Sequence, residues 1–208
     1  MQNSHLENLP NEILLKVLHY LETKDLIRVS LVSQRIRPIC HDETLWQTMN
    51  IQNGKVDSFP LVDPKSSCRL MDLESHEGSI KQKVPIGLVE LILNNGCEHL
   101  RFSNAELVGN MKLNKVSQLR YLVLQDCKCI SWDNPTEDFL ETLMASCDSL
   151  EKISMNKLPL SSYMLKSMCH ENGHSLQVLN LEACRGNYLI TLFISPITKI
   201  FIINHIVE

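Results

Sequence analysis

The chain has 208 residues, of which 44% are hydrophobic and 21% are charged, and its formal net charge is −4. A chain of this length can bury one full hydrophobic core or two small ones. Lys and Arg are scattered and fewer than Asp and Glu, so the charge pattern argues against nucleic acid as a partner.

The N-terminal residues, the cysteines and the sequence motifs indicate where the protein is located and whether it catalyses a reaction. The first residues lack the positive start and apolar stretch of a signal peptide, so we expect the nucleus and/or the cytoplasm. There the eight cysteines are expected to be free thiols in the core. Cys127 and Cys129 have no second ligand pair nearby, and His170 and His174 flank an expected helix end. Because no phosphate-binding loop or nucleophile motif is present, the sequence predicts no enzyme, no metal and no cofactor.

The segment 9–49 is expected to form three or four short helices with more apolar surface than they can bury among themselves. Pro10 is expected at the first helical position, where its missing N–H is harmless. Thr23 and Asp42 are expected to cap two later helices. The last of these is expected to carry Trp46 and Met49. Apolar residues recur at helical spacing in the first helix, at Ile13, Leu14, Val17, Leu18 and Leu21.

This segment also carries a series of anchor residues. In chain order they are Leu9, Pro10, Glu12, Ile13, Leu14, Tyr20, Leu21, Asp25, Leu26, Val32, Leu45 and Trp46. The series resembles an F-box, the segment that docks a substrate receptor onto the Skp-type adaptor of a cullin–RING ubiquitin ligase. The family usually has Cys, a basic pair and Trp after the Val, whereas this chain has Ser33, Gln34, Arg35 and Ile36.

The resemblance implies which residues face the adaptor: Leu9, Pro10, Ile13, Leu14, Val17, Leu18, Leu26 and Val29. Two short helices between polar linkers leave part of their apolar surface uncovered, so that surface favours a partner protein. An ordinary helical hairpin packed on its own domain is the alternative. The sequence after this segment, 51–67, contains Asn53-Gly54 and two prolines, and it is expected to form turns and a linker to the next domain.

From residue 68 a pattern of the form L-x-x-L-x-L-x-x-C recurs. Its clearest copies begin at Leu119, Leu150 and Leu176, and weaker copies begin at Cys68 and Cys97. Their first positions are 29, 22, 31 and 26 residues apart, which is centred on the length of a leucine-rich repeat. Helical patterns at 86–94, 138–146 and 161–171 lie between the expected strands.

Stacked copies are expected to form a short solenoid, with parallel strands on its concave side and helices on its convex side. Cys127 and Cys184 are expected to turn inward where the chain leaves a strand. The predicted fold class is thus α plus α/β: a three-helix F-box at 6–50, the linker at 51–67, and four to five leucine-rich repeats at 68–186. A doubly wound domain is the alternative, although it would need longer apolar strands.

An F-box followed by these repeats resembles the F-box/leucine-rich-repeat receptors of SCF-type ubiquitin ligases. That resemblance implies a non-catalytic subunit that binds the adaptor and a protein substrate, with the need for substrate phosphorylation left open. Strand alternation turns candidate substrate-binding residues outward, namely Tyr121, Gln125, Asn156 and Asn180. The alternatives are a truncated isoform that binds the adaptor without delivering substrate, and a repeat scaffold outside any ligase.

Residues 187–208 do not continue the repeat pattern. They are rich in Ile, Leu and Phe, but Pro196 and Lys199 interrupt the run and argue against a membrane span. We expect either a hydrophobic cap over the last repeat or, as the favoured hypothesis, the foreign ending of a truncated or alternatively processed product. On that hypothesis the chain is only marginally soluble.

Overall fold

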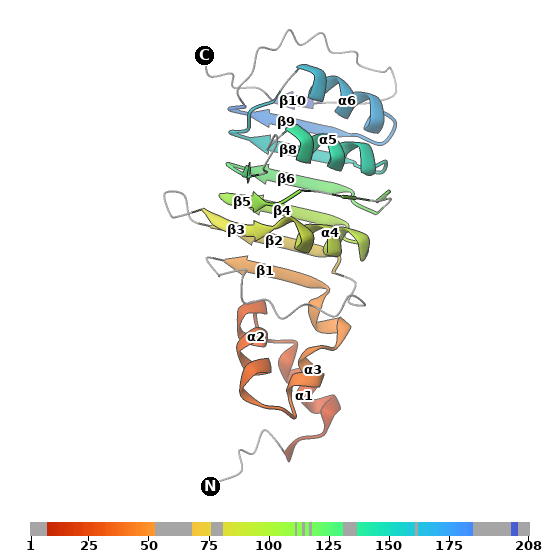
Figure 1. The fold of residues 1–208 in the computed structure, drawn as a ribbon. Coiled ribbons are helices and arrows are strands. Elements are labelled where there is room, and N and C mark those ends of the chain that lie inside the picture. Colours follow the sequence, from red (N-terminus) through yellow and green to blue (C-terminus); the bar gives the residue numbers. More distant parts are fainter. Residues whose placement is uncertain are drawn as a thin grey trace.

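The computed structural model describes residues 8–52, 68–75, 81–110, 112–113, 115–116, 118–130, 137–160, 162–184 and 201–203. The expected linker, apart from residues 51 and 52, and the expected tail, apart from 201–203, lie outside this part of the chain. Short helices form one end of the molecule, and a stack of strands extends from them to the other end (Figure 1). No helix of the described residues combines the length and the apolar character needed to cross a membrane.

Four short helical segments make up the N-terminal end. They are α1 (Asn11–Leu18), α2 (Thr23–Val32), α3 (Arg37–Cys40) and the 3₁₀ helix η2 (Glu43–Trp46). Leu18, Leu26 and Ile36 are at most 3% exposed and belong to the hydrophobic core. Ile36 is one of the residues that depart from the usual F-box pattern, and its burial shows that a branched apolar side chain fills this interior position.

The expected helix caps have different outcomes. Asp42 caps η2 as predicted, because its Oδ1 accepts the Thr44 N–H at 3.0 Å. The prediction for Thr23 is wrong, since Thr23 is the first residue of α2 and its hydroxyl instead accepts the Asn50 N–H at 3.2 Å. Pro10 stands one position before the first helical residue of α1, where it serves as the cap residue.

Seven parallel strands form the main sheet, in the order β1-β2-β4-β6-β8-β9-β10. They are β1 (Thr48–Gln52), β2 (Leu70–Glu74), β4 (His99–Ser103), β6 (Tyr121–Gln125), β8 (Lys152–Asn156), β9 (Val178–Glu182) and β10 (Phe201–Ile203). The strands follow one another in chain order across the sheet. A doubly wound domain reverses its strand order at a switch point, so that alternative is wrong.

The repeated sequence pattern determines the register of the main sheet. One buried row consists of Met71, Leu100, Leu122, Ile153 and Leu179, each at most 1% exposed. A second buried row consists of Leu73, Phe102, Leu124, Met155 and Leu181. The expected register of the weak copy that begins at Cys97 is confirmed, because its Leu100 pairs with Leu122. The final residue of the first copy, His76, lies outside the described residues.

A second sheet and three helices lie beside the main sheet. The sheet pairs β3 (Gln82–Pro85), β5 (Ala105–Val108) and β7 (Lys128–Ile130) in parallel. The helices are α4 (Ile86–Asn94), α5 (Glu137–Ser146) and α6 (Ser162–Asn172), and Figure 1 shows them in a row along the stack of strands. The three helices are confirmed, since each begins and ends within one residue of its expected bounds. The second sheet was not expected.

The helical end and the main sheet share one hydrophobic core. Trp46 ends η2 and Met49 lies in β1, and both are buried in the same apolar cluster, which extends from Leu18 to Cys184. The prediction that Met49 is helical is therefore wrong. Only Gln47 separates η2 from β1, so the passage from helices to sheet is direct. The expectation of a linker from residue 51 is wrong for Ile51 and Gln52, which belong to β1 and pair with β2. The rest of the expected linker follows this strand, between β1 and β2 in the sequence.

The backbone turns in the same way where the chain leaves four of the strands. The first residue after each strand has a positive φ, at Asn104 (53°), Asp126 (49°), Lys157 (57°) and Ala183 (52°). The next residue is buried in every case, at Ala105, Cys127, Leu158 and Cys184. The thiol of Cys127 donates to the Phe102 carbonyl at 3.4 Å, and that of Cys184 to the Met155 carbonyl at 3.3 Å. The expected inward turn of these two cysteines is confirmed.

Burial makes several of the cysteines poor nucleophiles. It raises the pKa of Cys97 and Cys127 to about 11 and that of Cys68 and Cys147 to about 12. The thiolate is the reactive form, and at pH 7.5 a thiol of pKa 11 is ionised to less than about one part in a thousand. We expect Ellman's reagent to spare these four thiols in the native protein and to modify all eight in denaturant. Rapid native modification of any of the four, mapped by peptide mass spectrometry, would contradict this burial.

Candidate functional site

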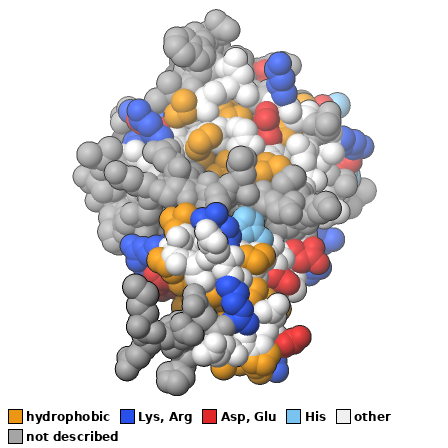
Figure 2. All heavy atoms as spheres, turned by 60° about the horizontal axis from the view of Figure 1, so that its bottom comes forward, with side chains coloured by type: hydrophobic (Ala, Val, Ile, Leu, Met, Phe, Trp, Pro, Cys, Tyr) orange, Lys and Arg blue, Asp and Glu red, His pale blue; other side chains and the backbone are white. Residues whose placement is uncertain are grey.

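Large apolar side chains are exposed mainly at the helical end. There they are Ile13 (42%), Val17 (40%), Tyr20 (91%), Leu31 (64%) and Val32 (79%). In the rest of the described chain the only comparable residue is Val108 in β5, at 38%. Figure 2 looks toward the helical end and shows apolar side chains among the polar ones on its surface. Burying exposed apolar side chains against a partner lowers the free energy of the system. These five residues are therefore a candidate docking site, called here the exposed apolar set.

The structure divides the adaptor-facing residues that the F-box resemblance implies. Those buried in the chain's own core, at 1–3% exposure, are Leu14, Leu18 and Leu26. Those accessible or partly accessible are Leu9, Pro10, Ile13, Val17 and Val29. The three buried leucines hold the helices in place and cannot contact a partner in this conformation. The accessible members remain candidate contacts.

Sequence reasoning missed three members of the exposed apolar set: Tyr20, Leu31 and Val32. Tyr20 and Val32 were already among the anchor residues of the F-box pattern, and this was a signal that could have identified them. The chain before α1 is held against the α2–α3 connection by Arg35, whose Nη2 donates to the Leu9 carbonyl at 2.7 Å. This bond fixes the backbone of Leu9 just before α1, the helix that carries Ile13 and Val17.

The main sheet presents a second candidate surface. Residues that alternate with the buried rows form three rows on the opposite side, which we call the open face. The first row is Leu70, His99, Tyr121, Lys152 and Val178. The second row is Asp72, Arg101, Val123, Ser154 and Asn180. The third row is Glu74, Ser103, Gln125, Asn156 and Glu182.

All four predicted substrate-binding residues lie on the open face, and each is partly exposed. Gln125 and Asn156 are neighbours in the third row, whereas Asn180 lies in the second row and Tyr121 in the first. The structure thus brings them to one surface, as strand alternation predicts. A role in binding a substrate stays a prediction for each.

Aromatic and charged groups are fixed around the first row. The rings of His99 and Tyr121 stack with their centroids 4.3 Å apart and their planes at 16°. The Tyr121 hydroxyl donates to Glu151 Oε2 at 3.3 Å, and Arg120 Nη1 pairs with Glu151 Oε1 at 2.8 Å. This network gives the face a preformed, partly apolar edge, and such edges favour contacts with another protein.

Three oxygen atoms on the open face are buried and have no hydrogen-bond partner. They are Oδ1 of Asp72, Asn156 and Asn180. The other carboxylate oxygen of Asp72 lies 3.6 Å from Arg101 Nη1. Burial raises the pKa of Asp72, and the nearby Arg101 only partly offsets this shift. Unpaired buried acceptors are uncommon, because leaving one without a donor costs about 1–3 kcal/mol.

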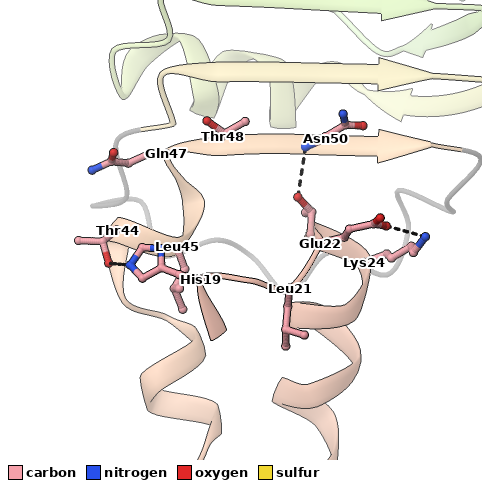
Figure 3. A pocket seen from close by; sticks show the side chains of 10 residues that line it. His19, Leu21, Glu22, Lys24, Thr44, Leu45, Gln47, Thr48 and Asn50 are labelled. Carbon is pink, nitrogen blue, oxygen red and sulfur yellow. Dashed lines mark hydrogen bonds and ion pairs between the residues drawn. The ribbon is translucent and has the colours of Figure 1, made fainter. Parts of the chain in front are cut away.

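A cavity of about 490 Å³ lies where the helical end meets β1 (Figure 3). Its two charged groups neutralise each other, with Lys24 Nζ 2.6 Å from Glu22 Oε2. The ring Nε2 of His19 is hydrogen-bonded to the Thr44 hydroxyl at 3.2 Å. The cavity therefore offers a ligand mainly hydroxyl and amide groups. Within the residues that the structure describes, no three side chains of His, Cys, Asp or Glu are grouped so as to hold a metal ion.

The helical end is similar in sequence to known proteins. The F-box-like family matches residues 6–52, which include all four helical segments and β1. The Saccharomyces cerevisiae protein "Ubiquitin ligase complex F-box protein UFO1" is 30% identical over 73 residues, which are 35% of this chain and 11% of the yeast protein. The chain thus spans a small fraction of the length of this relative. Residues 6–52 of this chain are an F-box-like domain.

Proposed function

We propose that this chain is a substrate-recognition subunit of an SCF-type ubiquitin ligase in the nucleus or cytoplasm. The F-box-like domain docks on the Skp-type adaptor and through it on a cullin–RING assembly, and the open face binds a protein substrate. The chain performs no chemistry itself, because the other subunits transfer ubiquitin. The observation that carries the proposal is the concentration of exposed apolar side chains on the F-box-like domain.

In this proposal the adaptor covers two groups of residues. The accessible residues implied by the F-box resemblance are Leu9, Pro10, Ile13, Val17 and Val29. The remainder of the exposed apolar set is Tyr20, Leu31 and Val32. Burial of apolar area contributes about 25 cal/mol per Å², so covering several such side chains supplies a large part of the binding free energy.

The main sheet and its helices are, we infer, a short leucine-rich-repeat solenoid. Support comes from the residues that recur at equivalent positions: the two buried rows, the positive φ after each of four strands, and the buried residue that follows it. The strands follow chain order, as stacked repeats do. Residues 68–186 would then be the repeat domain, with its concave side at the open face.

The shared core gives this arrangement a mechanical consequence. A receptor must hold its substrate at a set distance from the ubiquitin-transferring subunits. Trp46 and Met49 join the F-box-like domain to the sheet through buried contacts, and no flexible segment separates η2 from β1. The open face is therefore held in a fixed orientation relative to the adaptor-binding surface.

Substrate identity can be approached through a closer likeness. The runs 41–48 and 71–73 resemble the S-phase-kinase-associated F-box protein. That likeness would place the chain in the cell cycle, with a phosphorylated substrate destined for the proteasome. No substrate-binding residue is carried over from it, because no residue-level motif in this chain marks one.

Co-elution with a purified Skp-type adaptor in size-exclusion chromatography tests the proposal. We expect the wild-type chain to form a one-to-one complex, and we expect Leu9→Ala with Pro10→Ala to weaken it at least tenfold, because these residues open α1 at the accessible edge. Failure of the wild-type chain to bind would exclude a ligase role. If it binds but its expression raises no protein's turnover in cells, it occupies the adaptor without delivering substrate.

A further inference from the structure

The charged residues in the third row of the open face are all acidic. Its ends are Glu74 and Glu182, and between them lie Ser103, Gln125 and Asn156. None of the five is Lys or Arg. This row lies at the carboxyl ends of five parallel strands, so the side chains form one continuous strip across the sheet.

Among the residues that the structure describes, the cations near this strip already take part in other interactions. Arg101 in the second row is paired with Asp72 at 3.6 Å. Lys81 is paired with Asp126 at 2.8 Å, at the strand exit beside the strip. Lys157, which follows the strip beyond β8, also takes part in an interaction. The open-face cation outside these pairs is Lys152, and it lies in the first row, four residues and thus about 13 Å along the strand from Asn156.

The unpaired oxygens on the open face favour the same kind of ligand as its negative charge, namely one that donates hydrogen bonds. Oδ1 of Asp72, Asn156 and Asn180 can only accept hydrogen bonds, and none has a donor. The three oxygens are covered, although their residues are partly exposed, so a ligand contacts them only if the terminal amide or carboxylate groups rotate outward. A ligand that supplies N–H donors would satisfy them, whereas a ligand that supplies further acceptors would leave them unpaired.

We propose that the second and third rows bind an extended, unphosphorylated segment of the substrate through an Arg or Lys side chain. The cation pairs with Glu182, which lies four strand spacings and thus about 19 Å from Glu74, and it donates to the unpaired oxygens of Asn156 and Asn180. Apolar parts of the extended segment contact the stacked His99–Tyr121 pair. Arg suits the strip best, because its planar fork carries five donors. On the part of this strip that the structure describes, a phosphate group would meet carboxylates and hydrogen-bond acceptors but no Lys or Arg. This inference rests on the proposed function, since it names the substrate chemistry of the same surface.

Fluorescence anisotropy with labelled peptide pools tests it on the full chain bound to the adaptor. The short peptides are random except for a central residue, which is Arg in one pool, Glu in a second and phosphoserine in a third. We expect the Arg pool to bind at least about tenfold more tightly than either acidic pool, as two charge-assisted contacts would give. Preference for the phosphoserine pool, or equal binding of all three, would overturn the proposal.

A pair of variants locates the effect. Glu74→Gln with Glu182→Gln removes the two charges of the strip with little change in shape, and we expect it to lose most of the preference for the Arg pool. Glu106→Gln with Glu141→Gln makes the same change in net charge on β5 and α5, away from the open face, and should keep the preference. If both double variants lose the preference for the Arg pool equally, the preference depends only on net charge, and the strip is not the binding site. Adaptor binding is measured in parallel and reports on the proposed function separately.

Discussion

Ile13→Asp combined with Val17→Asp should reduce adaptor binding by more than about a hundredfold. The two residues are one helical turn apart on α1, so their side chains lie on the same side of the helix. At 42% and 40% exposure they contribute little to the chain's own core but present apolar area to a partner. The double change removes that area and forces two carboxylates into the interface, where an unpaired charge is costly. Isothermal titration with purified adaptor measures the effect.

The chain offers a matched control for this variant. Val108 is 38% exposed, but it lies in β5, away from the F-box-like domain. Val108→Asp should leave adaptor affinity within about twofold of wild type. Thermal unfolding should confirm that both variants remain folded, since surface changes of this kind usually shift stability by less than about 0.5 kcal/mol. Equal losses of affinity in the two variants would show that the exposed apolar set is not the docking site.

The main strands were predictable because their signal repeats. Side chains in a strand alternate with a period of two, and the buried positions of the pattern, such as Leu122 and Leu124, satisfy that period in each copy. Five copies reinforce one another, so even the weak copy at Cys97 is placed in the correct register. The three helices were predictable for a related reason, since each follows the helical period. In addition, α4 begins directly after Pro85 and α6 ends at Asn172.

The strands that sequence reasoning missed carry no such signal. β3, β5 and β7 have three or four residues each, which is too short for alternation to be distinguished from a loop. Met49 follows Leu45 and Trp46 at a spacing that fits a helix, yet it lies in β1 because its pairing with Met71 buries it completely. Tertiary contacts, which the local sequence does not record, decide these segments.

For the candidate docking site, the sequence predicted which helices form the surface but not which of their residues are exposed. Apolar spacing and the F-box resemblance identify α1 and α2, but they do not tell which apolar residues turn outward. Leu14 and Val17 both fit the helical stripe, but in the folded chain the first is 1% exposed and the second 40%. On the open face alternation alone was sufficient, because a strand has only two sides.

Trp46→Ala should destabilise the whole chain by about 3–5 kcal/mol, which is the usual cost of removing a buried aromatic side chain. Trp46 is 4% exposed, and its indole N–H donates to the Cys40 carbonyl at 2.6 Å. Because the residue lies in the core shared by the F-box-like domain and the sheet, we expect both parts to unfold together at a lower denaturant concentration. Urea unfolding followed by circular dichroism, with adaptor binding as a second probe, measures this.

Trp46→Phe separates packing from hydrogen bonding at the same position. It keeps an aromatic ring but loses the indole donor, so the Cys40 carbonyl is left unpaired at a cost of about 1–3 kcal/mol. We therefore expect it to be less destabilising than Trp46→Ala, with the two probes still changing together. A variant that lost adaptor binding well before the sheet signal would show that the two parts unfold independently. The rigid coupling proposed between adaptor and substrate surfaces would then fail, because a fixed orientation requires that the joint be as stable as the parts it connects.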